Sequence, residues 1–289
     1  MKKVLVFGSM GMAGFVISKY LSDQGHEVLG FARRESPHIK YVVGDIFDQH
    51  LVKDLIESER FDYIINCVGV LNNSAEADKM NAVYINSFFP HFISKLTQNI
   101  ETRIIHMSTD CVFSGNRGEY KEDDFTDGPT FYDRSKALGE LIDNKNITLR
   151  NSIVGPDINS KGIGLLNWFM NLPSQTKIKG FTGAIWTGLT TLELSKIIDF
   201  ILKSENHYFG LTNMVNNKTI NKFELLTLFN SVFRENDIQI EPYGEYEVNK
   251  SLIRTNFDID YKVPSYKEMI IELKKWMDIN KNFFPHYQI

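Results

Sequence analysis

A glycine-rich turn near the start of the chain constrains the fold more than any other feature. The preceding segment, Lys3 to Phe7, is a short and mainly apolar run of the kind found in strands buried in parallel sheets. Gly8, Gly11 and Gly14 follow this run, and an amphipathic helical pattern then extends to about Gln24. The segment therefore predicts a strand, a tight turn and a helix, the first part of a βαβ unit.

The same alternation of patterns recurs through the first half of the chain. Strand patterns occur at residues 27–32, 41–43, 63–67, 103–107 and 147–150, and helical patterns occur at 51–59, 80–97 and 131–144. Strands that alternate with helices pair in parallel through right-handed crossovers. The expected fold class is therefore α/β, a Rossmann-type doubly wound parallel sheet with a smaller C-terminal substrate-binding cap.

The pattern changes after Gly155-Pro156, where irregular and aromatic segments replace the regular alternation. Amphipathic helical patterns remain at residues 192–202, 222–233 and 266–278. We expect a dinucleotide-binding Rossmann domain over residues 1–155 and mainly a substrate-binding cap over residues 156–289. The boundary is soft, and a return of the chain to the first sheet around residues 180–215 stays open.

Composition and charge exclude several kinds of partner. The chain has 289 residues and a net charge of −4, with Lys and Arg dispersed, so nucleic acid is not an expected partner. No apolar stretch approaches the roughly 18 residues that a membrane helix needs, so we expect no membrane partner and a cytoplasmic location. Cys67 and Cys111 are the only cysteines and lie far apart, which predicts neither a disulfide nor a zinc site.

Three residues predict an acid–base site. Tyr132 and Lys136 are four residues apart in a helical pattern, so they share one face of the helix. A nearby ammonium favours the phenolate, so we expect Lys136 to lower the pKa of Tyr132 toward the working range of a general acid. Thr109, at the carboxyl end of a strand pattern, would hold a substrate carbonyl oxygen. A second pair with the same spacing, Tyr246 and Lys250, has no strand-end hydroxyl before it and is interpreted as an exposed helix or loop pair.

The glycine turn also predicts a cofactor site. It allows the backbone to approach a pyrophosphate closely, and the helix N-terminus favours the negative charge. At the end of the second strand pattern, where folds that bind NAD often carry an acid, the chain has Arg33 and Arg34. Two guanidiniums fit a 2′-phosphate, which favours NADPH and leaves NADH as the alternative; otherwise these arginines are solvated loop residues. Asp45 would lie near the adenine amino group or cap the following helix, and the two roles can coexist.

These motifs resemble the extended short-chain dehydrogenase/reductases, and within them the dTDP-4-dehydrorhamnose reductase-like sugar-nucleotide reductases. The resemblance covers nearly the whole chain and rests on residues 8–14, 44–45, 66–69, 85–86, 108–115, 132–140 and 149–152. It implies that Thr109, Tyr132 and Lys136 are catalytic and that Lys136 also bonds the nicotinamide ribose. The residues expected to bind the cofactor are Gly8, Ser9, Met10, Gly11, Met12, Gly14, Arg33, Arg34, Asp45, Ile46, Cys67, Val68, Gly69, Asn86, Tyr132 and Lys136.

Several of these assignments have structural alternatives. Asn86 lies near the active site in the family, but it is also suited to a capping or packing role, and the turn 67–69 equally fits a strand end that needs glycine. The residues expected to bind the substrate are Thr109, Asp110, Trp186 and Arg254. Trp186 is as often a core residue as a platform for a sugar. Arg254, like Lys177 and Lys179, is either a diphosphate partner or a surface charge.

Cys111 is the main departure from the family pattern. Related 4,6-dehydratases carry an additional acid or lysine at this position, so dehydration is disfavoured. The reductases usually carry a tyrosine there, which leaves the identity of the sugar in doubt. Members of the reductase family form metal-assisted dimers, so a homodimer is one expectation. No acidic cluster in the sequence maps onto the metal site, and no metal ligand is assigned.

The function that follows from the resemblance is NADPH-dependent reduction of the 4-keto group of a nucleotide-linked 4-keto-6-deoxy sugar, in polysaccharide precursor synthesis. The alternatives are an NAD-dependent sugar-nucleotide epimerase and a non-catalytic nucleotide-binding regulatory subunit. The intact set of Thr109, Tyr132 and Lys136 argues against the regulatory subunit.

Overall fold

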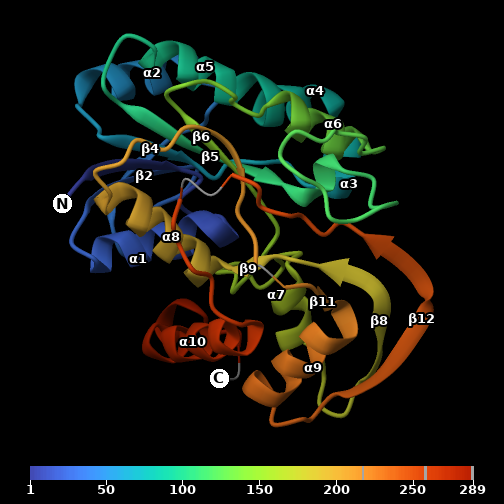
Figure 1. The fold of residues 1–289 in the computed structure, drawn as a ribbon. Coiled ribbons are helices and arrows are strands. Elements are labelled where there is room, and N and C mark those ends of the chain that lie inside the picture. The colour runs from blue at the N-terminus through green and yellow to red at the C-terminus, as the bar shows by residue number, and fades with distance from the viewer. Residues whose placement is uncertain (217, 257–258, 288–289) are drawn as a thin grey trace.

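The centre of the protein is a seven-stranded parallel sheet, seen in the computed structural model (Figure 1), which describes residues 1–216, 218–256 and 259–287. The strand order is β10-β6-β5-β4-β1-β2-β3, and every neighbouring pair is parallel. The strands are β1 (Lys3–Phe7), β2 (Glu27–Ala32), β3 (Lys40–Val43), β4 (Tyr63–Asn66), β5 (Arg103–Thr109), β6 (Ile147–Asn151) and β10 (Gly210–Asn213). This order confirms the predicted Rossmann-type fold class.

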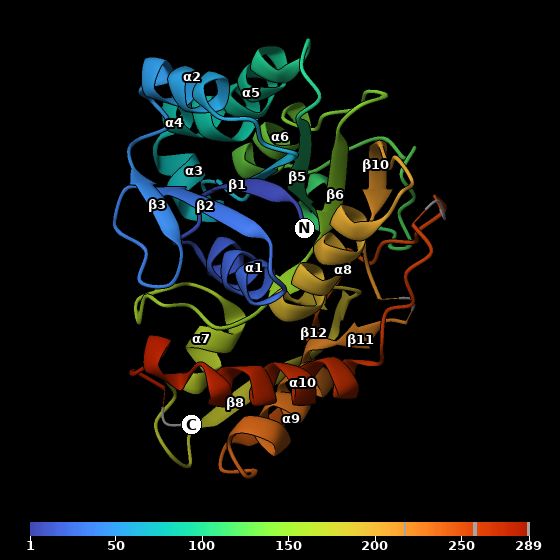
Figure 2. The same ribbon diagram turned by 90° about the vertical axis from the view of Figure 1, so that its left-hand side faces the viewer.

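Helices cover both faces of the sheet (Figure 2). One face carries α2 (Gln49–Ser58) and α5 (Phe89–Thr97), and the opposite face carries α1 (Met12–Asp23) and α8 (Thr191–Lys203). Because both faces are covered, the central strands are mainly apolar, as β1 and β4 are. Residues 189–213 therefore belong to the sheet region, since α8 packs on α1 and β10 extends the sheet beside β6.

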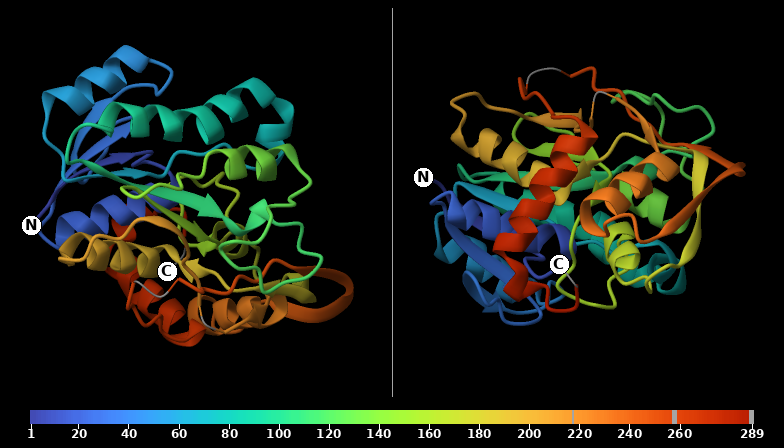
Figure 3. Two further views of the ribbon diagram at one scale, coloured as in Figure 1. Left: turned by 45° about the horizontal axis from the view of Figure 1, so that its top comes forward. Right: turned by 90° about the horizontal axis from the view of Figure 1, so that it is seen from below.

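The remaining elements form a cap below the second face of the sheet (Figure 3). A long strand, β8 (Lys177–Trp186), pairs in parallel with β12 (Gln239–Asn249) and antiparallel with β11 (Ile220–Asn221). A second small sheet joins β7 (Ile153–Val154) and β9 (Leu189–Thr190). The helices of the cap are α7 (Leu165–Met170), α9 (Lys222–Phe233) and α10 (Tyr266–Ile279), followed by a 3-10 turn, η3 (Lys281–Phe283).

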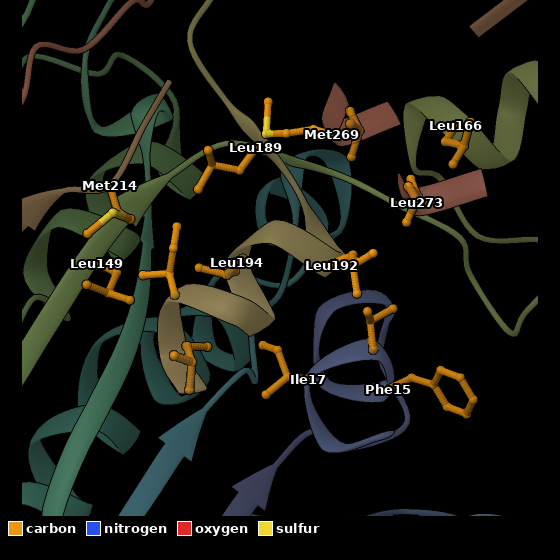
Figure 4. Close-up of a cluster of buried hydrophobic side chains, with 14 of the residues drawn as sticks. Phe15, Ile17, Leu149, Leu166, Leu189, Leu192, Leu194, Met214, Met269 and Leu273 are labelled. Carbon is orange, nitrogen blue, oxygen red and sulfur yellow. The ribbon is translucent and has the colours of Figure 1, made fainter. Parts of the chain in front are cut away.

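One continuous apolar core joins the cap to the sheet (Figure 4). Phe15 and Ile17 of α1 and Leu194 of α8 belong to the same buried cluster as Met269 and Leu273 of α10. The cap is therefore packed on the sheet domain through buried side chains, and this packing fixes the ends of β8 and β12 relative to the sheet.

Of two helical patterns above the sheet, the one at 80–97 is confirmed, with a π-helical segment inside it, and the one at 131–144 is wrong in length. The pattern at 80–97 comprises α4 (Lys79–Ala82), a π-helical segment η1 (Val83–Phe88) and α5, preceded by a short α3 (Asn72–Ala77). The pattern at 131–144 gives α6 (Phe131–Leu138), which is six residues shorter than expected. The helix ends at Leu138, and its C-cap is Gly139, where any side chain would meet the carbonyl oxygen of Asn86 at 1.8 Å, so the close approach of the two segments requires glycine.

The interpretation of Tyr246 and Lys250 as an exposed helix or loop pair is wrong in part, although Tyr246 is exposed and Lys250 lies in a loop. Tyr246 belongs to strand β12, and Lys250 follows directly after the end of that strand. Polar and apolar residues alternate from Glu245 to Asn249, but Pro242 and Gly244 interrupt the pattern of β12, and most of its residues are exposed. Across the described residues, no helix is both long enough and apolar enough to span a membrane.

Candidate active site

A cleft of about 570 Å³ opens at the carboxyl ends of β1, β2, β3 and β4. In the strand order, the chain reverses direction of winding between β1 and β4, which is where doubly wound folds bind their ligands. Ten predicted cofactor residues line the cleft: Gly8, Met10, Gly11, Arg33, Arg34, Asp45, Ile46, Cys67, Val68 and Gly69. The structure adds lining residues that the sequence did not indicate, among them Phe47 and Asn159.

The glycine turn has the close packing that a phosphate-binding turn needs. Gly8 has a φ of 79°, a left-handed conformation that favours glycine. At Gly14 a side chain would meet the carbonyl oxygen of Gly8 at 2.1 Å, so only glycine lets α1 start this close to β1. Ser9 and Gly14 are buried beneath the turn, and Ser9 Oγ has no hydrogen-bond partner among the described residues. The N-terminus of α1 lacks a side-chain cap at Gly11, which leaves its N–H groups suited to an anion.

The charged residues that follow β2 and β3 line the same cleft. Arg33 and Arg34 are exposed, and Arg34 Nη2 donates to Met10 O at 3.2 Å, so its guanidinium reaches across the glycine turn. The carboxylate of Asp45 accepts a hydrogen bond from Phe47 N at 3.1 Å. The N-cap of α2 is Asp48, so Asp45 is not the helix cap, although it stabilises the turn before it.

Thr109 and Tyr132 meet beside Cys111. Thr109 ends β5, and its hydroxyl accepts from Cys111 N at 3.1 Å and donates to Asp110 Oδ1 at 3.2 Å. Thr130 and Asp133 form a capping box that starts α6, which places Tyr132 in the first turn of the helix. Burial raises the pKa of Tyr132 above its ordinary value, and a side-chain hydrogen bond with Thr109 opposes this shift. The expected lowering by Lys136 is therefore wrong for the protein alone, and the phenol keeps its proton.

Lys136 is buried below Tyr132 on the same helix. Its ammonium donates to Met107 O at 2.7 Å, and burial lowers its pKa to about 8 while the carboxylate of Glu140 raises it. Cys67 also acts on this ammonium, so Lys136 lies close to the wall of the cofactor cleft. The position is compatible with a contact to a bound cofactor ribose.

Glu140 anchors a buried ion pair under the catalytic strand. Its two carboxylate oxygens accept from Arg150 Nε at 2.7 Å and Arg150 Nη2 at 2.8 Å, and both side chains are 3% exposed. Ser108 Oγ donates to the same carboxylate at 2.6 Å. This bidentate pair fixes the end of β5 against β6 and α6, and so fixes the positions of Thr109 and Lys136.

Asn86 connects the cofactor cleft with α6. Its amide oxygen accepts from Val70 N, and its nitrogen donates to Val70 O and to Ser135 Oγ, all at 2.9 to 3.0 Å. Asn86 lies in the π-helical segment, and such segments are frequent at functional sites. Because its hydrogen-bonding capacity is used within the protein, the geometry favours a positioning role over direct contact with a ligand.

The residues expected to bind the substrate differ in burial and in what they contact. Asp110 is buried next to Thr109, and burial raises its pKa. Trp186 is 4% exposed and belongs to the main core cluster, which favours the alternative of a core residue. Arg254 is buried, with Nη1 at 3.8 Å from Met214 Sδ. Lys177 and Lys179 are exposed, and Lys177 stands about 30 Å along β8 from Trp186.

Two lysines that face Asp110, Lys222 and Lys250, carry no signal in the sequence that marks them as site residues. Lys222 is the first residue of α9, and Lys250 follows β12; both ammoniums lower the pKa of Asp110. A lysine at a helix start or after an exposed strand normally indicates a solvated charge, so only the packing of the cap reveals them.

The fold and the arrangement of Thr109, Tyr132 and Lys136 beside a dinucleotide-type cleft define the class as an extended short-chain dehydrogenase/reductase. Residues 1–175 match the family model described as the RmlD substrate binding domain, and the chain belongs to this family.

Individual relatives agree with this membership. The chain is 32% identical to the probable low-salt glycan biosynthesis reductase of Haloferax volcanii, over 47% of the chain and 46% of that protein. It is 27% identical to a dTDP-4-dehydrorhamnose reductase of Aggregatibacter actinomycetemcomitans, over 73% and 72% of the two chains. The chain spans about half the length of the first of these relatives and of the spore coat polysaccharide biosynthesis protein of Bacillus subtilis. The crystal structure of a Bacillus anthracis dTDP-4-dehydrorhamnose reductase with NADP superposes with a TM-score of 0.79 at 19% identity, covering 94% of this chain and 98% of that one.

Proposed function

We propose that the protein is a reductase that uses NADPH to reduce the 4-keto group of a nucleotide-linked 4-keto-6-deoxy sugar, in polysaccharide precursor synthesis. The observation that carries the proposal is the position of a protonated Tyr132 next to Thr109, with Lys136 on the same helix and close to Cys67 in the wall of the cofactor cleft. The names of the relatives support the same chemistry. We also propose that residues 1–155, with α8 and β10, form the cofactor domain and that the rest forms the substrate cap.

The residues of the cleft fit a dinucleotide phosphate. The glycine cradle, the uncapped start of α1 and the arginine pair supply N–H groups and charge for phosphates. Bound in this cleft, NADPH would supply a hydride to the carbonyl carbon. In the proposed roles, Thr109 holds the carbonyl oxygen, Tyr132 donates its phenolic proton to that oxygen as it gains negative charge, and Lys136 stabilises the phenolate that remains.

This function is tested by following the cofactor and the sugar together. With a dehydratase-generated 4-keto-6-deoxy sugar nucleotide, we expect one NADPH to be consumed for each sugar and the product to gain two hydrogens in mass. The parent sugar with a 4-hydroxyl group is the control and should consume none. An isomer of unchanged mass without net loss of NADPH would indicate an epimerase. The absence of turnover with dTDP-, UDP- and GDP-linked ketosugars would indicate the regulatory subunit.

Arg33 and Arg34 should decide the choice of cofactor. Changing both to Ala is expected to weaken NADPH binding by about tenfold or more and NADH binding much less, because only NADPH carries the 2′-phosphate. Isothermal titration of both cofactors measures the difference. The double variant also removes the hydrogen bond from Arg34 to Met10 O in the glycine turn. The single variant Arg33→Ala keeps this bond and is therefore the control for a change in the turn. Equal losses for the two cofactors would remove the arginines from this role.

A further inference from the structure

Two segments of the cap place a lysine near the end of β5, where Thr109 lies: Lys250 follows β12, and Lys222 starts α9. The last residue of β12, Asn249, donates its N–H to Gly115 O at 2.8 Å, and Ser251 Oγ accepts from Glu119 N at 2.8 Å. These bonds fasten the segment around Lys250 to the loop that follows Thr109 and Asp110. Lys250 is therefore held next to this loop by the hydrogen bonds of its two neighbours in the chain, Asn249 and Ser251.

Lys222 reaches the same place from α9. Asn221 forms a capping box with Glu224, which starts the helix at Lys222. The preceding strand β11 pairs Ile220 with Trp186, and the Lys222 ammonium lies over the Trp186 ring, 4.6 Å from its centre. The aliphatic stem is thus placed along a buried aromatic ring, and the charge is directed toward Asp110.

The charges at this place do not balance. Asp110 is the carboxylate that acts on Lys222, and both lysines act on Asp110. Asp133 lies near Cys111 and Tyr132, but its carboxylate accepts from Thr130 N at 3.1 Å as part of the capping box of α6. Within residues 1–216, 218–256 and 259–287, no salt bridge joins either lysine to a carboxylate. Two ammoniums facing one buried carboxylate leave one positive charge beside Thr109.

The Lys222 ammonium, which carries part of this excess positive charge, is partly buried. Burial lowers the pKa of Lys222 to about 8, while Asp110 raises it. A cation that is drawn away from water without a full partner is costly, and such sites are generally completed by an anion.

We propose that Lys222, together with Lys250, binds an anionic oxygen of the substrate and so positions the sugar nucleotide against Thr109 and Tyr132. The inference rests on the proposed function, because the anion is taken to belong to a nucleotide sugar. Two groups of such a substrate have this chemistry: the diphosphate and a carboxylate on the sugar. Both would take charge-assisted hydrogen bonds from the ammonium.

The test compares three variants of the NADP-saturated protein by isothermal titration. Lys222→Met keeps an unbranched side chain over Trp186 but removes the charge, and Lys222→Arg keeps the charge. Lys267→Met removes an exposed lysine of α10 and is the matched control. With dTDP, dTDP-glucose, UDP-glucose and UDP-glucuronate as probes, we expect Lys222→Met to weaken binding by about tenfold or more. Lys222→Arg should stay within a few-fold of wild type, and Lys267→Met should bind as wild type.

The pattern of losses identifies the anion. A similar loss for dTDP and dTDP-glucose assigns Lys222 to the diphosphate, whereas a loss confined to UDP-glucuronate assigns it to a sugar carboxylate. Wild-type affinity of Lys222→Met for every probe overturns the inference, as does a wild-type protein that binds none of them. Binding of NADP shows that a variant is folded. If Lys222→Met does not bind NADP, the test is repeated with Lys250→Met, which changes the lysine that follows β12. If the wild-type protein did not oxidise NADPH with ketosugars, the proposed function would be rejected. The titrations would still show whether Lys222 binds the anion.

Discussion

Replacing Tyr132 with Phe is expected to lower turnover of a 4-keto sugar nucleotide by about a hundredfold to ten-thousandfold, because the change removes the proton donor and keeps the ring. The buried phenol is protonated and bonded to Thr109, so its hydroxyl is placed to donate. Binding of NADPH should stay within a few-fold of wild type. The rates are best compared at pH 7, below the pKa of about 8 to which burial lowers Lys136, so that its ammonium is charged in both proteins.

The second tyrosine of the same spacing provides the matched control. Tyr246 is 49% exposed on β12, and Tyr246→Phe makes the same chemical change outside the catalytic loop. Its turnover should equal that of wild type. Near-normal turnover of Tyr132→Phe, or an equal defect in Tyr246→Phe, would show that the proton comes from another group.

The sheet could be predicted from the sequence because its strands carry their own signal. Strands buried on both faces are continuous apolar runs, and each is followed by a turn residue or a polar strand end, as Phe7 is by Gly8. The amphipathic pattern at residues 222–233 predicts helix α9 with its observed bounds, and the structure adds a capping box of Asn221 and Glu224 at its start. Most of the cofactor cleft followed from the same signals, since the strand ends of a parallel sheet gather at one edge.

The cap could not be predicted in the same way, because its pairing partners are distant in the sequence. Strands β8 and β12 pair across more than 50 intervening residues, and Pro242 and Gly244 interrupt the alternating pattern of β12. Lys222 and Lys250 lie near each other only because β8 joins β11 to β12. Neither lysine has a local pattern that distinguishes it from an exposed charge.

The sequence also could not show how the helices above the sheet approach one another. The close approach of Gly139, the C-cap of α6, to Asn86 requires a residue without a side chain, and Asn86 is placed by a π-helical turn. A π-helical turn changes which residues share a face, and it has no signature in the apolar pattern. The inward direction of Asn86 therefore became clear only from its bonds to Val70 and Ser135.

Breaking the buried ion pair should have the largest effect on stability. Glu140→Leu is expected to lower the free energy of unfolding by about 3–5 kcal/mol, because it leaves the Arg150 guanidinium buried without its carboxylate. Ser108 also loses its acceptor. An exposed pair on α1, Lys19 and Asp23, is the control, and Asp23→Ala should cost less than about 1 kcal/mol. Urea denaturation of the three proteins measures both differences.

The double variant Glu140→Leu and Arg150→Met separates stability from function. Two apolar side chains leave no uncompensated charge, so we expect the double variant to regain most of the stability that Glu140→Leu loses. Activity should not return in parallel, because Glu140 raises the pKa of Lys136 and its loss lets that pKa fall further. Less of the ammonium is then present at neutral pH to stabilise the Tyr132 phenolate. If the double variant were as unstable as Glu140→Leu, the cost would come from lost packing at β5 and β6 and not from an unpaired charge.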